Sequence, residues 1–398
     1  MGKDERKALI KDAQAAVKKQ FRTSLTGIAA KEYERPSVFA SSGSLALDRL
    51  CSGGNPGGFP IGPRYGRTIH IAGEWSTGKS LILDHGFKSV LVDLQGLAVR
   101  TETEGTADPY FAKAIGLPLD LLVVQKPRTF EEGFDLFEEW HTAVRKENDE
   151  IPILWGWDSL DSTEAEKSAG QGLSEAGGWR YGGGRGEVLG VGLRRFATMS
   201  ARYPTTLVML NQTRDNVGVM FGPKKRTPGG NPPHFYASLE VMLTSAPRPG
   251  GGFVRDPARE TGLTKEALKR LGLTYNLEAS RVRGRYIRAK ITKTKMAMTF
   301  DTTADFYLDF RKGINPWEGL MERLIFEGIL TTSADGLSNF SMAGTLWPNK
   351  NEWLKWLSEK LNAGAYDDVG LGAAQELADT PDELPTDAPD LPDEPGDE

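Results

Sequence analysis

The sequence contains little cysteine and little histidine. Cys51 is the only cysteine, and four histidines are scattered over 398 residues. A single thiol can form neither an internal disulfide nor a cysteine-based zinc site, and it suits a reducing compartment. The scattering of the histidines argues against a structural metal site. From these absences we expect a cytoplasmic protein.

Long apolar runs are also absent. No stretch approaches the roughly 18 apolar residues that a membrane-spanning helix needs. The residues after Met1 are mostly charged and no apolar segment follows them, so a secretory signal is not expected. The sequence thus predicts a protein that has no membrane partner.

Basic residues are missing from the last part of the chain. After Lys360 there is no lysine or arginine, whereas twelve of the 54 acidic residues lie there. The rest of the chain holds 49 basic and the other 42 acidic residues, a net charge of +7 compared with −5 for the whole. A basic body suits a protein that binds a polyanion. The acidic tail could compete with that polyanion, or it could simply keep the protein soluble.

The most informative motif is Gly73-Glu74-Trp75-Ser76-Thr77-Gly78-Lys79-Ser80, which fits the phosphate-binding pattern G-x-x-x-x-G-K-[ST]. A strand is expected before it at 67–72, and a helix after it at 81–88. The two motif glycines allow the backbone N–H groups to face phosphates, and the helix N-terminus adds positive charge. Lys79 would contact the β- and γ-phosphates, and the Ser80 hydroxyl would bind Mg²⁺. The motif predicts a nucleoside triphosphate site.

Strand-like apolar runs alternate with helical stretches through the central body of the chain. The expected strands are 68–72, 97–101, 121–124, 153–157, 206–210, 240–244 and 286–291. The expected helices include 130–146 and 188–201. Such alternation is typical of a doubly wound α/β domain with a mostly parallel central sheet. Ligand-binding loops should then lie at the carboxyl ends of the strands.

Composition divides the chain into four expected parts. They are an N-terminal helix and linker (1–42), the α/β core (43–313), a small α-rich C-terminal domain (314–363) and a disordered acidic tail (364–398). Two irregular segments interrupt the core, a glycine-rich loop at about 165–187 and a basic insertion at 249–284. The arginines of the insertion could contact a polyanion or a neighbouring subunit, or could simply be solvated.

Acidic residues follow two of the expected strands. Asp158 comes directly after 153–157 and could hold Mg²⁺ through water. Glu104, or with less support Glu102, follows 97–101 and could orient the water that attacks the terminal phosphate. Acids at strand ends are common, and a solvated charge is the alternative for each of them. The residues alone leave these roles open.

Several segments, taken in order, resemble the RecA family of DNA recombinases over about residues 5–330. Residues 211–214, 217–222, 229–231 and 235–238 resemble the second DNA-binding loop of that family and the strand that follows it. Shorter segments resemble the end of the family's polymerisation helix (19–21), the start of its core (43–48) and the cover over adenine (108–112). By the order and spacing of these segments the chain is identified as a divergent member of the family.

The resemblance implies that ATP and Mg²⁺ are the ligands of the phosphate loop. Lys79 and Ser80 match the phosphate and Mg²⁺ ligands, and Asp158 matches the carboxylate that holds Mg²⁺ through water. Glu104 lies four residues before an Asp-Pro pair, where the family keeps the glutamate that activates water. Gln212 matches a sensor of the γ-phosphate at the root of the second loop.

Further residues are assigned by the same resemblance. Asp108 and Phe111 fall in the adenine cover, where the family often has a tyrosine in place of Phe111. Lys293 and Lys295 match a pair that reaches the ATP of the neighbouring subunit, which would make hydrolysis depend on assembly. An exposed strand face is the alternative for these two lysines.

Two loops are expected to contact DNA. The first, recognisable only by its position at 165–187, offers residues for base stacking and phosphate contact, with a plain flexible loop as an equal alternative. Its expected contacts are Trp179, Arg180, Tyr181 and Arg185. Those of the second loop, 213–230, are Arg214, Val219, Met220, Phe221, Gly229 and Gly230. Asn216 and His234 stand where basic residues are common, so the second loop would grip DNA differently.

The function implied by the resemblance is that of a DNA-dependent ATPase. Such a recombinase forms helical filaments on single-stranded DNA and exchanges strands with duplex DNA in recombination and repair. The alternatives are a hexameric helicase-type motor of the same fold and a non-catalytic coating protein for single strands. The second loop and the lysine pair favour the recombinase over the motor, and Glu104 and Gln212 argue against a coating protein. The divergent loops and the insertion favour a phage or mobile-element version.

Overall fold

The computed structural model describes most of the core and part of the C-terminal region. The described residues are 38–52, 57–61, 67–105, 107–169, 184–215, 225–227, 229–255, 282–295, 302–326, 328–333, 338–342 and 345–362, with residues 8, 11, 15 and 270. Apart from residues 8, 11, 15 and 38–42, the expected N-terminal helix and linker (1–42) lies outside this set. The tail over 364–398 lies outside it too.

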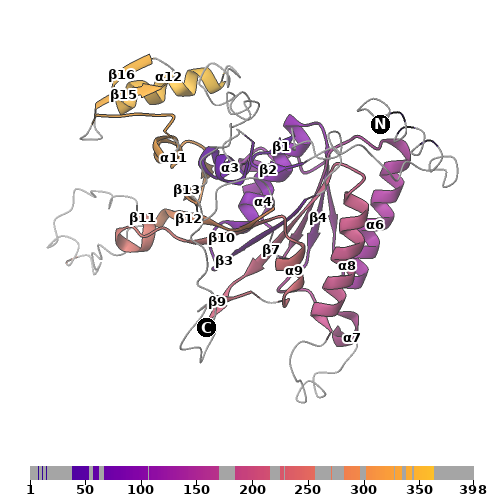
Figure 1. Ribbon diagram of the computed structural model, residues 1–398. Helices are drawn as coiled ribbons and strands as arrows, with labels where there is room; N and C mark the ends of the chain where they lie inside the picture. Colours follow the sequence, from indigo (N-terminus) through magenta and orange to yellow (C-terminus); the bar gives the residue numbers. More distant parts are fainter. Residues whose placement is uncertain are drawn as a thin grey trace, which may run out of the picture. The chain divides into compact units, whose positions relative to one another are not determined.

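One large sheet organises the core (Figure 1). Its strand order is β14-β13-β12-β10-β3-β7-β6-β4-β5, and β11 pairs with β12 beside this path. Six neighbouring strands run parallel: β3 (Thr68–Gly73), β4 (Leu97–Glu102), β5 (Leu122–Gln125), β6 (Ile153–Asp158), β7 (Thr205–Gln212) and β10 (Leu239–Ser245). The mostly parallel α/β sheet expected from the sequence is therefore confirmed.

Antiparallel strands complete the sheet beyond β10. They are β11 (Phe253–Arg255), β12 (Val282–Thr294), β13 (Thr303–Asp309) and β14 (Gly313–Asn315). The two ends of the expected basic insertion, 249–284, thus reach the sheet through β11 and the start of β12. The middle of the insertion lies outside the described residues, apart from residue 270.

Helices cover both faces of the parallel strands. They are α3 (Leu45–Ser52), α4 (Lys79–Lys88) with a π-helical continuation (Ser89–Asp93), α5 (Pro109–Ala114), α6 (Phe130–Glu147), α7 (Glu166–Ala169), α8 (Arg185–Ser200) and α9 (Pro232–Tyr236). In Figure 1, α6 and α8 lie side by side over one face, while α3 and α4 lie on the other. Short pairs add β1 (Phe39–Ala40) with β2 (Phe59–Pro60), and β8 (Arg214–Asp215) with β9 (Lys225–Arg226).

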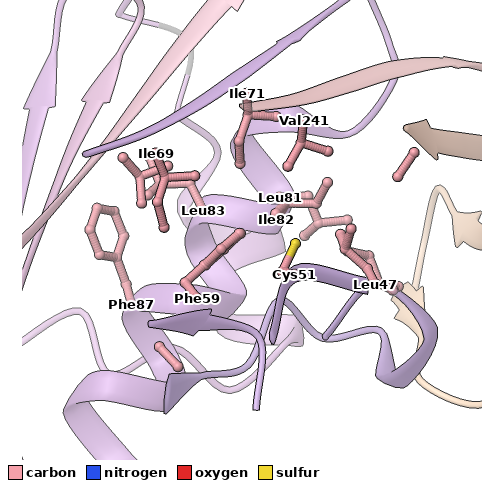
Figure 2. Packing of buried hydrophobic residues seen from close by; sticks show 14 of the residues in the cluster. Leu47, Cys51, Phe59, Ile69, Ile71, Leu81, Ile82, Leu83, Phe87 and Val241 are labelled. Carbon is pink, nitrogen blue, oxygen red and sulfur yellow. The ribbon is translucent and has the colours of Figure 1, made fainter. Parts of the chain in front are cut away.

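The side-chain alternation of the strands builds one core on each face of the sheet. In β7, Leu207 and Met209 join the cluster under α6 and α8, whereas Val208 and Leu210 join the cluster under α3 and α4. Figure 2 shows the second cluster, where Phe59, Leu83 and Phe87 meet strand residues. Because successive side chains of a strand point to opposite faces, a run of apolar residues fits a sheet that is covered on both sides.

Local signals account for the start of α6, the longest helix among the described residues. The Thr129 hydroxyl accepts a hydrogen bond from the Glu132 N–H at 3.2 Å, and the Glu132 carboxylate accepts one from the Arg128 N–H at 2.6 Å. These two bonds satisfy N–H groups at the helix start, which have no partner within the helix. The predicted start at Phe130 is confirmed.

The C-terminal region forms a second compact unit, whose described part begins at Met321. The expected boundary at 314 instead falls within β14, which completes the large sheet. The second unit contains a hairpin of β15 (Ser338–Met342) and β16 (Thr345–Asn349), followed by α12 (Lys350–Asn362). Helix α11 (Leu320–Phe326) spans the junction. The expected domain was α-rich, and the structure adds this hairpin to its helices, with Phe340 of β15 stacked on Trp353 of α12.

Candidate nucleotide-binding site

The phosphate-loop motif joins the end of β3 to the start of α4. Gly78 has a φ of 80°, a left-handed conformation that glycine adopts without steric cost and that here precedes the first residue of the helix. The Lys79 ammonium donates to the carbonyl oxygens of Gly73 at 3.1 Å and Glu74 at 2.7 Å. Burial lowers the pKa of Lys79, and nearby acids, Asp158 first among them, oppose that shift. The Lys79 side chain is therefore folded back onto the backbone of the loop.

A cavity of about 420 Å³ opens over this loop. It is lined by residues 75–81 and by Asp84, Arg100, Glu104, Ala107, Asp108, Phe111, Asp158, Ser159, Gln212, Leu308 and Phe310. Thus the structure brings the predicted Trp75, Ser76, Thr77, Gly78, Lys79 and Ser80 together with the predicted Glu104, Asp108, Phe111, Asp158 and Gln212. Gly73 and Glu74 lie in the same loop, although neither lines the cavity.

Strand order explains why these residues meet. The cavity lies at the carboxyl ends of four adjacent parallel strands, β4, β6, β7 and β3. Pairing places Glu102 opposite Asp158 and Gly73 opposite Gln212. In parallel sheets this edge is where ligands bind.

Glu104 faces the cavity, whereas Glu102 does not. The Ser159 hydroxyl donates a hydrogen bond to the Glu104 carboxylate. Glu102 is buried at 6% exposure, accepts from the Gly105 N–H at 2.8 Å and lies 3.2 Å from the Arg100 guanidinium. The two carboxylate oxygens of Glu102 are therefore held inside the fold. Of the two glutamates, Glu104 is the one that a ligand in the cavity can reach.

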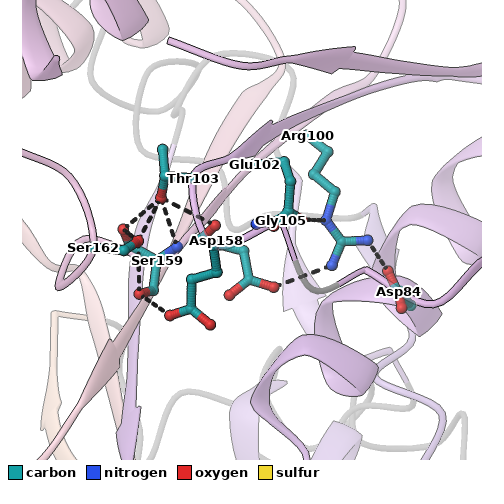
Figure 3. A network of polar contacts seen from close by, with 9 residues as sticks. Asp84, Arg100, Glu102, Thr103, Gly105, Asp158, Ser159 and Ser162 are labelled. Atoms are coloured by element: carbon teal, nitrogen blue, oxygen red, sulfur yellow. Dashed lines mark hydrogen bonds and ion pairs between the residues drawn. The ribbon is translucent and has the colours of Figure 1, made fainter. Parts of the chain in front are cut away.

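A buried ion network beneath the cavity was not anticipated from the sequence (Figure 3). Arg100, only 4% exposed, contacts Asp84 at 2.6 Å and Asp158 at 3.1 Å. Burial raises the pKa of Asp84 to about 6, although Arg100 opposes the shift. An arginine within the apolar run 97–101 and an aspartate within the apolar helix 81–87 were the available signals, because buried charges are rarely found without a partner.

Ser80 and Asp158 supply the donors that a magnesium ion would need. Mg²⁺ prefers oxygen ligands and keeps several waters, usually with one or two carboxylates and substrate phosphates. The exposed hydroxyl of Ser80 and the carboxylate of Asp158 line the same cavity, so the donor set fits this ion. One oxygen of Asp158 is bound by Arg100.

The lysine pair lies apart from the cavity. Lys293 is on β12 and Lys295 directly follows the end of that strand, and neither lines the space over the phosphate loop. The Lys293 ammonium donates to the carbonyl oxygens of His234 and Phe235, and the Lys295 ammonium donates to that of Phe235 at 3.3 Å. Both lysines thus hold the carbonyl groups at the end of α9.

Only part of the expected DNA contacts can be placed. Trp179, Arg180, Tyr181, Val219, Met220 and Phe221 lie outside the described residues. The Arg185 guanidinium donates to the backbone carbonyls of Leu160 at 3.1 Å and Asp161 at 2.8 Å. The Arg214 side chain is 62% exposed and makes two hydrogen bonds, at 3.0 and 2.8 Å, to the Asp161 carboxylate.

The structure describes the two ends of the second loop, a short ribbon and a glycine turn. Its ends form the β8–β9 ribbon, in which Arg214 pairs with Arg226. Gly229 and Gly230 have φ angles of 95° and 72° and lead into α9. An added Cβ at Gly229 would lie 3.2 Å from Leu189, so this turn packs closely against α8.

Comparison with known proteins points to one family. A family model described as the RecA N-terminal domain matches residues 8–248. A Protein RecA from Lactococcus lactis subsp. cremoris (strain MG1363) is 26% identical over 365 residues, covering 91% of this chain and 78% of the relative. One from Lactobacillus delbrueckii subsp. bulgaricus (strain ATCC 11842) is 29% identical over 246 residues, 62% of this chain and 69% of the relative.

A third relative named Protein RecA, from Mesomycoplasma hyopneumoniae (strain 7448), is 26% identical over 309 residues. The match covers 78% of this chain and 78% of the relative. Within the described part of the chain, no helix has the length and apolar character that crossing a membrane requires.

Proposed function

The chain belongs to the RecA family, and we propose on that basis that it is an ATP-dependent recombinase. It would assemble as a filament on single-stranded DNA and pair that strand with homologous duplex DNA. The observation that carries the proposal is the cavity in which the phosphate loop, Glu104, Asp158 and Gln212 meet, directly beside the root of the second loop.

In this proposal the cavity takes ATP. The backbone N–H groups of the loop and the N-terminus of α4 would face the phosphates, with Lys79 turning from its carbonyl partners to the β- and γ-phosphates. Asp108 and Phe111 would lie along the adenine, where an aromatic face can stack on a base. A magnesium ion held by Ser80 and Asp158 would neutralise phosphate charge.

Glu104 is proposed to orient the attacking water. Its carboxylate accepts from Ser159, which fixes its direction, and it lines the same cavity as Lys79. Phosphoryl transfer depends chiefly on positioning and charge stabilisation, so a fixed carboxylate near the terminal phosphate fits the requirement.

Gln212 is proposed to connect nucleotide state with DNA contact. It ends β7 inside the cavity, and the ribbon that carries Arg214 begins two residues later. A side chain that senses the γ-phosphate would therefore change the root of the loop that binds DNA. The DNA would be held mainly through its phosphates and by base stacking, with homology read by base pairing.

Lys293 and Lys295 are proposed to act on the ATP of an adjacent copy of the chain. Neither lysine lines the cavity of its own subunit, which is consistent with this role, since Lys293 lies near the end of β12 and the exposed Lys295 directly follows that strand. Added positive charge at a subunit boundary would stabilise the transition state only after assembly.

The test measures ATP hydrolysis by the full chain with and without single-stranded DNA, together with electron micrographs and a strand-exchange assay. We expect turnover stimulated by single strands, helical filaments, and heteroduplex formation that requires ATP. Rings without filaments would instead identify a motor, and filaments without turnover would identify a coating protein. Absence of both nucleotide and DNA binding would contradict all three functions.

A further inference from the structure

Three polar side chains meet on the sheet outside the proposed ATP site. His70 lies in β3, Glu240 lies directly opposite it in β10, and His234 belongs to α9, which immediately precedes β10. One potential ligand atom from each residue lies within 4.8 Å of those from the other two. The histidines are far apart in the sequence, and only the pairing of β3 with β10 brings them together.

Each of the two histidines faces the Glu240 carboxylate with its Nδ1 atom. The Nδ1 atom of His234 lies 2.7 Å from one Glu240 oxygen, and the Nδ1 atom of His70 lies 3.9 Å from the other. Behind them, the Nε2 atom of His234 lies 3.0 Å from the Thr227 hydroxyl, and that of His70 lies 3.5 Å from the Asn211 amide nitrogen. The Thr227 hydroxyl can accept the N–H of a metal-bound histidine, and a half-turn of the Asn211 amide would place its oxygen to accept from His70 in the same way.

One of these inner atoms lacks a hydrogen-bond partner. The Nδ1 atom of His70 is buried, makes no hydrogen bond among the described residues, and belongs to a side chain with 0% exposure. A buried polar atom left in this way is costly, and natural proteins rarely tolerate it without a ligand, a water or an ion. The atom points to the carboxylate at a distance too long for a hydrogen bond.

We propose that His70, His234 and Glu240 bind a transition-metal ion of the zinc class. Two histidines and one glutamate, with water in the fourth position, are an established ligand set for Zn²⁺. Ligand atoms around a tetrahedral zinc ion lie about 3.4 Å apart, as bonds of about 2.0–2.2 Å require. One ligand atom from each of the three residues already lies within 4.8 Å of the other two, so relative shifts of at most about 1.4 Å would complete the site.

The surroundings leave room for a fourth ligand. A cavity of about 500 Å³ opens onto the cluster and is lined by Asn231, His234, Phe235, Glu240, Thr292 and Lys293. Lys293 also lines this cavity, and its ammonium is held by the carbonyl oxygens of His234 and Phe235. Its charge would weaken binding, whereas the charge of Glu240 would strengthen it.

An ion bound here would join three parts of the fold. His70 lies three residues before the phosphate loop, Glu240 lies in the core sheet, and His234 contacts Thr227 at the end of the second loop. The ion would therefore fix α9 and the return of the second loop against the strand that carries the phosphate loop. The site stands on its own residues, so it can exist whether or not the chain is a recombinase.

The experiment titrates the metal-free full chain with Co²⁺, a visible substitute for Zn²⁺, and then adds Zn²⁺. We expect one Co²⁺ per chain with the strong visible absorption of a tetrahedral site, displacement by Zn²⁺, and a higher Tm with Zn²⁺. In His234→Ala, whose parent side chain is 43% exposed, folding should persist while the absorption and the Tm shift are lost. His85→Gln, which alters a histidine outside the cluster, should behave as the parent does.

His234→Cys provides a second measurement that loss of folding cannot imitate. A thiolate at position 234 should keep the metal and add a sulfur-to-cobalt charge-transfer band in the near ultraviolet. The proposal would be overturned if Co²⁺ binding did not saturate and the bound ion kept the spectrum of the free ion. Equal spectra for the parent, His234→Ala and His234→Cys proteins would also overturn it, because position 234 would then not be a ligand.

Discussion

The backbone N–H of Thr213 donates a hydrogen bond of 3.1 Å to the carbonyl oxygen of Gly73. Gly73 begins the phosphate loop, and Thr213 is the first residue after β7. The same carbonyl accepts from the Lys79 ammonium at 3.1 Å. If Lys79 turned to a phosphate, the Gly73 carbonyl would lose that bond and keep the one from Thr213, and this would connect the phosphate loop with the start of the second loop.

The Gln212→Ala protein should bind ATP but lose stimulation of its ATPase by single-stranded DNA. Gln212 lies in the cavity one residue before Thr213, so its amide is the side chain best placed to report the phosphate to the loop. We expect the stimulation to fall at least about 5-fold, the lower range of typical coupling between sites. Rates with and without DNA measure it, and unchanged stimulation would remove Gln212 from the coupling.

The Glu104→Gln protein should bind ATP and DNA with affinities near those of the parent. Its turnover should fall by about 10²–10⁴, the usual contribution of a positioned acid or base. Glu147→Gln, which alters an exposed glutamate at the end of α6, serves as the control and should leave turnover unchanged. Turnover by Glu104→Gln at the parental rate would show that another group orients the water.

Mixing two inactive proteins tests whether the lysines act between subunits. The Lys293→Ala/Lys295→Ala protein keeps Glu104, and Glu104→Gln keeps both lysines. In an equimolar mixture on DNA, about one interface in four would join an intact cavity to intact lysines, because head-to-tail assembly pairs different surfaces. We expect about a quarter of the parental rate. Lys290→Ala, on the same strand, should remain active alone, and an inactive mixture would argue against action between subunits.

The Arg100→Met protein should be much less stable than the parent. Arg100 is buried among the carboxylates of Asp84, Glu102 and Asp158, and its loss leaves their charges uncompensated. We expect a loss of about 3–5 kcal/mol in urea unfolding, and partial recovery in Asp84→Leu/Arg100→Leu. Arg195→Met breaks a half-exposed pair with Asp135 and should cost about 1 kcal/mol or less. Similar losses for both arginines would contradict the network's importance.

Asp48 predicts a pH dependence of folding. Burial raises its pKa from 3.8 to about 6, despite hydrogen bonds from Ser41 and Ser42. Because the folded state holds the proton more tightly, this residue's contribution is fully present below pH 3.8 and is lost as the pH rises through 6. Asp48→Asn should therefore gain stability relative to the parent across this range, by on the order of 3 kcal/mol.

Urea unfolding at pH 4 and pH 7 measures that difference. The Asp149→Asn protein, altered at an exposed aspartate, should follow the parent at both values. A constant difference between Asp48→Asn and the parent would show that Asp48 titrates alike in the folded and unfolded chains.

Much of the fold could be predicted because its signals are local. The strand 68–72 and the helix 130–146 carry their own apolar pattern and ends, and both agree with the structure to within a residue. The expected boundary at 314 falls within β14, which is only three residues long and is defined by its pairing with β13. A short strand of this kind has no periodicity that a sequence could display.

The sequence by itself determined the phosphate loop and the acids that face it. A motif of fixed spacing and acids at the ends of strands suffice, since parallel strands bring their carboxyl ends to one edge. Only the tertiary structure decided which buried charges compensate one another and which histidines meet. Asp84 with Arg100, and His70 with His234 and Glu240, are joined by strand order and register, and such long-range contacts leave no pattern along the chain.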